Sequence, residues 1–270
     1  MNAARRSVLV VLATVVAVLG LTGSASAAVA PTGYDVSYPQ CGKPLPSSPA
    51  FGVVGVNGGL ATTANPCLAP QLTWAWKSSG AVAAQPKAQV YLNTANPGEI
   101  RTQVKTWPTA GSTPYGTCDG SNSSACSWQY GWERAQNSVL NIFTPAAHAA
   151  AADSRPASYT WWLDVETGNT WQSGSSAALT RNRATLEGMT AYLVGQGGRI
   201  GFYSTSSQWT VIVGSTPTTS NLAGRNSWLP GATTLNGAIA NCVKPPLTPG
   251  GHVTLTQYVA NKLDSDHSCV

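Results

Sequence analysis

The sequence predicts an α/β protein of the (β/α)8 TIM-barrel type, in a modified form and with three disulfides. Short apolar or β-branched segments alternate with helical or loop segments, as parallel βαβ units do. The chain has 270 residues, and without its first 27 it matches the roughly 250 residues of a typical eight-stranded barrel. Its six cysteines form an even set, as expected of an exported protein that forms disulfides.

Seven segments carry the strand signal, one fewer than a complete barrel needs. Each is short and apolar or β-branched, with helical or loop segments between one and the next. The predicted strands are 32–37, 51–57, 88–94, 159–166, 199–205, a short one near 227–230, and 253–259.

The clearest predicted helix spans 177–195, because leucine and methionine recur there at helical spacing. Ser175 or Ser176 can cap its start, and glycines end it. A second helix is predicted over about 128–152, with an interruption near Thr144-Pro145, because proline disfavours a helical conformation in the preceding residue. The stretch 111–127 is predicted to be a long polar loop.

The first 27 residues have the features of a secretory signal peptide. Two arginines, Arg5 and Arg6, precede an apolar run over 7–21, and Ala25-Ser26-Ala27 is a small-residue cleavage site. A membrane anchor is the alternative, but the run is short for a span. We expect cleavage after Ala27 or Ala28 and a single mature domain over 28–270, either extracellular or associated with the cell wall. Nothing beyond residue 28 is long and apolar enough to cross a membrane.

The six cysteines permit 15 disulfide pairings, so the sequence does not determine the connectivity. Pairing each cysteine with its nearest neighbour closes three local loops, and the last of these ties down the C-terminus. Zinc binding is disfavoured, since there is no CxxC or HxxxH. The nearest-neighbour pairs are Cys41–Cys67, Cys118–Cys126 and Cys242–Cys269.

The charge of the chain is low in density and mildly positive. Charged residues make up 9% of the sequence, with a formal net charge of +5. No basic cluster or basic helix is present, which argues against nucleic-acid binding. A mild positive balance suits an anionic surface such as a bacterial wall. No signal for an interface stands out, so we expect a monomer.

Two carboxylates, Asp164 and Glu166, lie in the aromatic segment YTWWLDVETG. Alternation in a strand places them on one face with Trp162, and that face points into the barrel. Barrel enzymes keep their active sites at the carboxyl ends of the strands. Two neighbouring carboxylates in an apolar setting favour one neutral acid and one charged partner, which suits glycosidic-bond hydrolysis. The alternative is structural, with both acids bonding backbone N–H groups of a turn.

Three further acids could join this pair. Asp35 ends the first predicted strand, whereas Asp264 and Asp266 follow the last one. The first and last strands are neighbours in a closed barrel, so all three could reach the same rim. Taken singly, each also suits an ordinary turn or cap.

The ordered segments resemble those of glycoside hydrolase family 25, the secreted muramidases (lysozymes) built on a modified α/β barrel. GYDVSYPQ (33–40) is similar to the family's opening strand, and WLDVET (162–167) to its central Asp-x-Glu strand. IGFYSTSSQW (200–209) resembles a later strand followed by a tryptophan. LTQYV (255–259) with a trailing aspartate resembles the closing strand.

The resemblance implies a role for each matching residue. Glu166 would be the general acid, Asp164 would orient or stabilise a reacting 2-acetamido group, and Asp35 would be the first-strand acid. The implied reaction is cleavage of the β-1,4 bond after N-acetylmuramic acid in peptidoglycan, with no cofactor or metal. Residues expected to bind the substrate are Tyr203, Trp162, Gln257, Tyr258, Trp209, and Asp264 or Asp266 as the closing acid.

The sequence also departs from the family. The family often has an acid after the second strand, where this chain has GGLATTANPC (58–67). Two alternatives therefore stay open: a non-catalytic glycan-binding protein on the same barrel, and a chitinase-like glycosidase. The chain has 10 Trp and 9 Tyr but only 3 Phe, a balance that favours a carbohydrate cleft.

Overall fold

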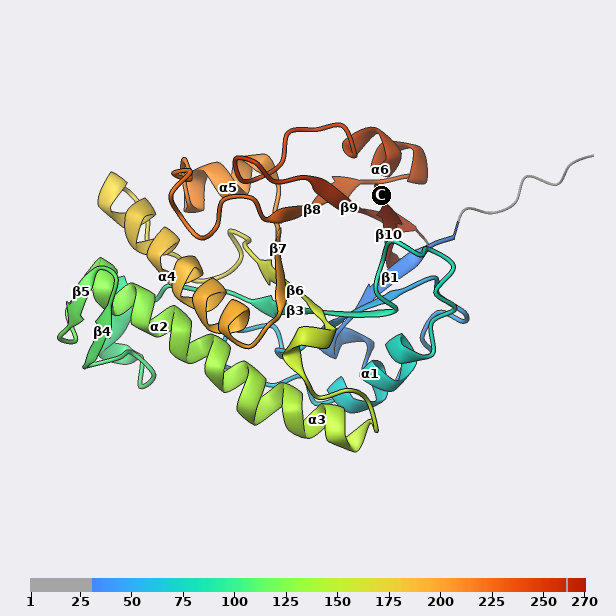
Figure 1. Cartoon of the computed structure of the whole chain (residues 1–270), viewed down its shortest axis with the longest axis horizontal. Coiled ribbons are helices and arrows are strands. Elements are labelled where there is room, and N and C mark those ends of the chain that lie inside the picture. Colours follow the sequence, from blue (N-terminus) through green and yellow to red (C-terminus); the bar gives the residue numbers. More distant parts are fainter. Residues whose placement is uncertain (1–30, 261) are drawn as a thin grey trace, which may run out of the picture. The chain divides into compact units, whose positions relative to one another are not determined.

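The computed structural model describes residues 31–260 and 262–270, so the predicted signal peptide lies outside the described residues. Eight strands close into a barrel in the order β1-β10-β9-β8-β7-β6-β3-β2 (Figure 1). The predicted barrel class is therefore confirmed. Its strands are β1 (Gly33–Val36), β2 (Gly52–Gly55), β3 (Ala88–Asn93), β6 (Thr160–Asp164), β7 (Arg199–Tyr203), β8 (Asn226–Ala232), β9 (Val253–Ala260) and β10 (Leu263–Ser268).

The eighth strand is β10, which the sequence-based prediction missed. It pairs antiparallel with both β9 and β1, whereas every other neighbouring pair in the barrel is parallel. Its sequence LDSDHS is too polar to be recognised as a strand, and a tight hairpin joins it to β9. Asp264 and Asp266 therefore lie within a barrel strand, not in a segment after the last one.

Helices cover the outside of the barrel (Figure 1). Trp161, Leu163 and Val165 belong to the apolar cluster between strands and helices, whereas Trp162 packs in a separate cluster inside the barrel. This confirms the two faces predicted for β6. The helices are α1 (Leu68–Trp76), α2 (Ser124–Asn137), α3 (Thr144–Ala149), α4 (Ser176–Gly195), α5 (Ser206–Ile212) and α6 (Leu235–Asn241).

The two predicted helices are both present. In α4 the Ser175 side chain accepts a hydrogen bond from the Ala178 amide, so Ser175 is the cap. The second helix starts earlier than predicted, at Ser124, and has no break at Pro145. A π-helical stretch over 138–143 connects α2 to α3, and Pro145 occupies the first turn of α3. The π-helical stretch accommodates the proline by changing the hydrogen-bond pattern just before it, so the helix continues.

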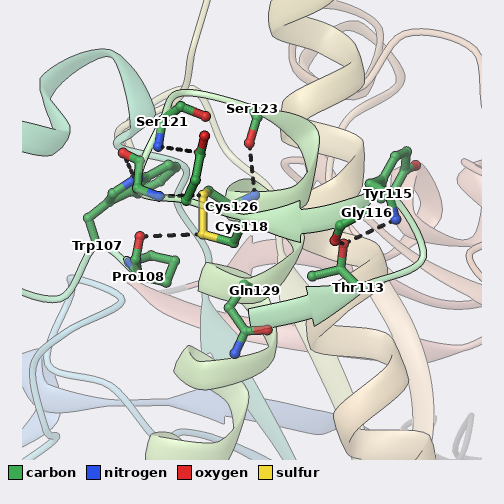
Figure 2. The surroundings of a disulfide bond; sticks show 12 residues. Trp107, Pro108, Thr113, Tyr115, Gly116, Cys118, Ser121, Ser123, Cys126 and Gln129 are labelled. Carbon is green, nitrogen blue, oxygen red and sulfur yellow. Dashed lines mark hydrogen bonds between the residues drawn. A yellow bond between two sulfur atoms is a disulfide. The ribbon is translucent and has the colours of Figure 1, made fainter. Parts of the chain in front are cut away.

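The nearest-neighbour disulfides all form: Cys41–Cys67, Cys118–Cys126 and Cys242–Cys269. The predicted polar loop at 111–127 contains a small hairpin, β4 (Gly111–Thr113) and β5 (Gly116–Cys118), followed by the first turn of α2. Figure 2 shows the Cys118–Cys126 bond joining the end of this hairpin to that turn. Within the described residues, no helix is both long and apolar enough to span a membrane.

Candidate active site

A row of side chains crosses four neighbouring strands at their carboxyl ends. Asn93 of β3 is paired with Asp164 of β6, Asp164 with Tyr203 of β7, and Tyr203 with Trp228 of β8. Because these parallel strands are in register, residues far apart in sequence meet at one level of the barrel. The row marks the rim where an α/β barrel holds its functional groups.

A cavity of about 410 Å³ opens above this row. It brings together six of the residues expected from the sequence to form the site, namely Asp35, Asp164, Glu166, Tyr203, Gln257 and Asp264. Its remaining lining is Ser37, Tyr38, Pro39, Gln40, Gly59, Tyr91, Asn93, Gly168, Asn169 and Trp228.

Asp164 lies deep in the cavity and is only 6% exposed. One carboxylate oxygen, Oδ2, accepts a hydrogen bond from Asn93 Nδ2 at 3.0 Å, while Oδ1 is buried with no partner among the described residues. Burial raises the pKa of Asp164 well above its usual range, and the nearby charges of Glu166 and Asp35 raise it further. The neutral form of Asp164 is therefore favoured more strongly than that of an exposed aspartate.

Glu166 lies two residues beyond Asp164, past the end of β6, and is half-buried. Gln208 of α5 contacts Glu166 Oε1 through its Nε2 at 3.4 Å, and the Gln208 Oε1 accepts the Thr167 amide at 2.5 Å. The Trp171 indole N–H donates to the Glu166 backbone carbonyl at 3.0 Å. These contacts hold the backbone of the turn while leaving the carboxylate at the cavity edge.

Asp35 is part of a chain of hydrogen bonds across the barrel. Tyr203 donates its hydroxyl to Gln257 Oε1 at 2.9 Å, and Gln257 Nε2 donates to Asp35 Oδ2 at 2.9 Å. Burial raises the pKa of Asp35 to about 7, helped by the negative charge of Asp264 and opposed by the Gln257 hydrogen bond. Asp35 therefore titrates close to neutral pH.

The two acids of β10 occupy different positions. Asp264 lines the cavity and is partly exposed, whereas Asp266 is 0% exposed and does not line it. Neither oxygen of Asp266 makes a hydrogen bond within the described residues. Burial and the adjacent Asp35 raise the pKa of Asp266 well above its usual range. Asp264 is thus the acid that a ligand could contact, whereas Asp266 is buried in the barrel next to Asp35.

Aromatic rings form the floor beneath the acids. The Trp228 ring centroid lies 4.5 Å from that of Tyr203, 5.8 Å from that of Trp162 and 6.4 Å from that of Tyr91. Trp162 is 1% exposed, so it belongs to the packed interior and not to the cavity surface. This apolar floor is the physical cause of the desolvation that raises the carboxyl pKa values above it.

Two residues expected at the site lie elsewhere. Trp209 is buried on α5 and packs against Phe202 on the outer face of the barrel. Tyr258 packs with Ala232 and Ala238 in a separate cluster. Its neighbour Gln257 faces the cavity, so alternation along β9 turns Tyr258 outwards.

The sequence-based prediction missed Asn93, which supports Asp164 directly. Its signal was available, because a polar residue at the carboxyl end of a predicted strand lies on the same rim as the acids. Tyr91 and Trp228 also line the cavity without having been assigned to the site. Each occupies an inward-facing strand position, which the sequence alone does not distinguish from an outward-facing one.

The turn after β2 leaves no room for a side chain at Gly58. A Cβ atom at Gly58 would lie 2.6 Å from the Ala64 carbonyl oxygen and 3.2 Å from Thr63 Oγ1. Asn57 pairs with Ala64 in an antiparallel bridge and donates from Nδ2 to the Thr63 carbonyl. The turn is therefore closed over Gly58, and a larger residue requires the backbone to move.

The cavity is acidic and contains no basic counterpart. In the described part of the chain, no Lys, Arg or His lines it. Over the same residues, no cluster of three or more His, Cys, Asp or Glu side chains is arranged to hold a metal ion. Burial raises the pKa values of Asp35, Asp164 and Asp264, and the side-chain amides of Gln257 and Asn93 donate hydrogen bonds to the first two. This arrangement suits proton transfer to an uncharged ligand better than binding of an anion.

Comparison with known proteins finds solved structures that are similar to this chain in backbone trace, at low sequence identity. No protein-family model and no curated protein sequence matches the chain. A muramidase from Trichobolus zukalii is 17% identical, with a TM-score of 0.48, over 88% of this chain and 92% of that one. The bacterial lysozyme from Streptomyces coelicolor is 16% identical, with a TM-score of 0.47, over 88% of this chain and 91% of that one.

Proposed function

We propose that this protein is a secreted glycoside hydrolase of the muramidase type, which cleaves β-1,4 bonds of peptidoglycan. The observation that carries the proposal is the pair Asp164 and Glu166 in one cavity at the carboxyl ends of the barrel strands. One member of the pair is buried with a free carboxyl oxygen, and the other is at the edge. Paired carboxyl groups in two such environments are the basis of glycosidic-bond hydrolysis.

Glu166 takes the role of general acid. Its carboxyl group is at the accessible edge, where the oxygen that links two sugars can reach it. It donates its proton to that oxygen as the bond to the anomeric carbon breaks. It then accepts a proton from the water molecule that attacks the same carbon in the second step.

Asp164 takes the role of positioning the nucleophile, which is the 2-acetamido group of the sugar being cleaved. Its Oδ1 atom is a buried acceptor without a partner among the described residues, and an acetamido N–H would supply the missing partner. The acetamido oxygen then attacks the anomeric carbon as the leaving sugar departs. Tyr203, held by Gln257, lies in the same row and can contact the acetamido group.

The test compares the wild-type protein with Glu166→Gln on purified peptidoglycan, following new reducing ends and identifying the terminal sugar by mass spectrometry. We expect wild type to release muramic-acid reducing ends and Glu166→Gln to lose about 10²-fold or more of that rate, the usual contribution of a general acid. Glu133→Gln is the matched control, because Glu133 lies on α2, outside the cavity, and accepts a hydrogen bond from Gln129. It should leave the rate unchanged.

Two other results would replace the proposal. A folded wild-type protein that sediments with peptidoglycan but releases no reducing ends would be a glycan-binding protein. The observation that favours this outcome is the segment after β2, which carries no acid where the resembling family often has one. Cleavage of chitin but not of peptidoglycan would indicate a chitinase-like glycosidase.

A further inference from the structure

A second cavity, of about 370 Å³, shares no residue with the catalytic cavity. It lies where the β4–β5 hairpin meets α2, α4 and the loop after α5. Its lining is Pro114, Tyr115, Trp128, Arg183, Glu187, Pro217, Thr219, Ser220 and Asn221. The hairpin that contributes Tyr115 was expected to be only a polar loop, and the proposed reaction does not use any of these residues.

The walls of this second cavity are rigidly placed. Helices α2 and α4 approach so closely that a Cβ at Gly131 would lie 1.9 Å from the Thr185 carbonyl oxygen, and one at Gly188 would lie 2.0 Å from that of Trp128. Thr185 also donates its hydroxyl to the Ser127 carbonyl at 3.0 Å. These contacts fix Trp128 of α2 beside Arg183 and Glu187 of α4.

The hairpin is fixed by its own set of contacts. The Cys118–Cys126 disulfide joins its last strand to α2, and Gln129 lies against Gly111 on its first strand (Figure 2). At its tip, Thr113 Oγ1 donates to the Gly116 carbonyl and accepts the Tyr115 amide. A cavity formed before the ligand arrives does not have to order its walls on binding.

Tyr115 presents an aromatic ring in a fixed orientation. The ring is 40% exposed, and the hydroxyl donates to Glu187 Oε2 at 2.5 Å. Ser220 Oγ donates to Glu187 Oε1 at 2.6 Å, so both carboxylate oxygens are engaged. Burial and the Glu187 contact raise the pKa of Tyr115 to about 12, which keeps the phenol neutral. The ring can therefore act as a flat apolar surface whose edge is already hydrogen-bonded.

Two groups in the cavity have hydrogen-bonding capacity left for a ligand. The Trp128 indole N–H has no partner among the residues that the structure describes. Arg183 uses Nη1 for the Ser215 carbonyl at 3.0 Å and Nη2 for Thr180 Oγ1 at 3.5 Å, which leaves further N–H donors of its five. Its positive charge is matched by Glu187 one turn along the helix, so the cavity does not select for a charged ligand.

We propose that this cavity, defined by Tyr115, Trp128, Arg183 and Glu187, is a second glycan-binding site that holds a β-1,4-linked N-acetylhexosamine chain away from the catalytic acids. Flat rings with free polar donors beside them suit a pyranose, which has apolar faces and a polar rim. A lipid surface would need a larger apolar patch, and an anionic ligand would need uncompensated cations. That the chain is wall glycan rests on the proposed function, whereas the site itself does not.

The experiment measures binding without cleavage. Tyr115→Ala and Trp128→Ala are each introduced into the Glu166→Gln protein, and co-sedimentation with purified insoluble peptidoglycan gives the affinity. We expect each variant to bind about tenfold more weakly, the effect of losing one aromatic contact of about 1.4 kcal/mol. Tyr115→Phe keeps the ring and should retain most of the affinity. Leu140→Ala, an exposed apolar truncation beyond α2, is the matched control and should bind like its parent.

A second probe tests the chemistry of the occupant, namely soluble glycan strands from which an amidase has removed the stem peptides. Weakened binding of the Tyr115→Ala and Trp128→Ala proteins to these strands supports a glycan site. Weakened binding to intact peptidoglycan alone would identify a stem peptide as the occupant and overturn the proposal. Unchanged binding in both variants, with unfolding temperatures like their parent, would also overturn it. None of these outcomes depends on whether the protein cleaves peptidoglycan, so this experiment tests the second site independently of the proposed function.

Discussion

Replacing Asp35 by asparagine should stabilise the protein at alkaline pH and not at acid pH. In the folded protein the Asp35 carboxyl is crowded by Asp264 and set against a dry interior, which together raise its pKa from 3.8 to about 7. Asparagine keeps the shape of the neutral acid and can still accept the hydrogen bond from Gln257 Nε2. The substitution therefore removes the penalty of ionisation while keeping the contact.

The sign and size of the effect follow from proton linkage. A folded-state pKa above the unfolded one means that the folded protein binds the proton more tightly. The stability that the Asp35 carboxyl contributes is therefore fully present below pH 3.8 and is lost as the pH rises through about 7. A pKa difference of about 3 corresponds to an upper limit of about 4 kcal/mol. The partial exposure of Asp35 to the cavity reduces this, and we expect about 2 kcal/mol in the free energy of unfolding at pH 8.

Urea unfolding at pH 4 and pH 8, followed by tryptophan fluorescence, measures the effect directly. Asp35→Asn should be close to wild type at pH 4 and more stable at pH 8. Asp119→Asn is the matched control, because Asp119 is exposed and its pKa is lowered by hydrogen bonds from Ser121. That variant should show no gain at pH 8. An equal change for Asp35→Asn at both pH values would refute the reasoning, since it would place the effect in packing and not in ionisation.

Two further predictions concern the scaffold of the second cavity. Gly188→Ala places a Cβ 2.0 Å from the Trp128 carbonyl oxygen and should lower the free energy of unfolding by about 2 kcal/mol. Gly195 lies in the same helix with open space around it, so Gly195→Ala should raise the free energy of unfolding by up to about 0.5 kcal/mol. Calorimetry on both separates them, and equal effects would contradict the close helix contact. Replacing Cys118 and Cys126 together by serine should cost about 2 kcal/mol in denaturant unfolding, and no change would mean that the hairpin is held without the bond.

The barrel could be predicted from the sequence because its parallel strands have a strong local signal. In β6, the alternation of Trp162 and Asp164 with Trp161 and Leu163 separated the inner face from the outer one without any structural information. The seven predicted strands all form. Each has enough β-branched and aromatic residues for local preference to agree with the final structure.

The eighth strand could not be predicted, because its stability comes from its neighbours. Alternate residues of β10, Asp264 and Asp266, face the acids and amides of β1 and β9, so the strand lacks the apolar alternation that marks a buried segment. Only closure of the barrel provides it with partners on both edges. The same closure decides that Asp264 reaches the cavity and that Asp266 does not.

The aromatic members of the predicted site could not be placed for a related reason. Trp209 and Tyr258 belong to the residue types that often bind sugars, yet both pack outside the cavity. A tryptophan near a strand end carries no information about which side of the barrel it faces. Asn93 and Trp228 have the correct direction because the pairing of four strands puts them in one row.

The distribution of acids is the strongest argument that the cavity has a chemical role. The chain has 10 acidic residues in all, and Asp35, Asp164, Glu166, Asp264 and Asp266 gather at one end of one barrel. Four of the five line the cavity, and no Lys, Arg or His is present in its described lining, although the sequence has 15 Lys and Arg. Such a cluster is unfavourable for folding, because burial and neighbouring carboxylates oppose the ionisation of Asp35, Asp164 and Asp266. Turns and caps need no such concentration, so the distribution of acids supports the proposed catalytic role of the cavity.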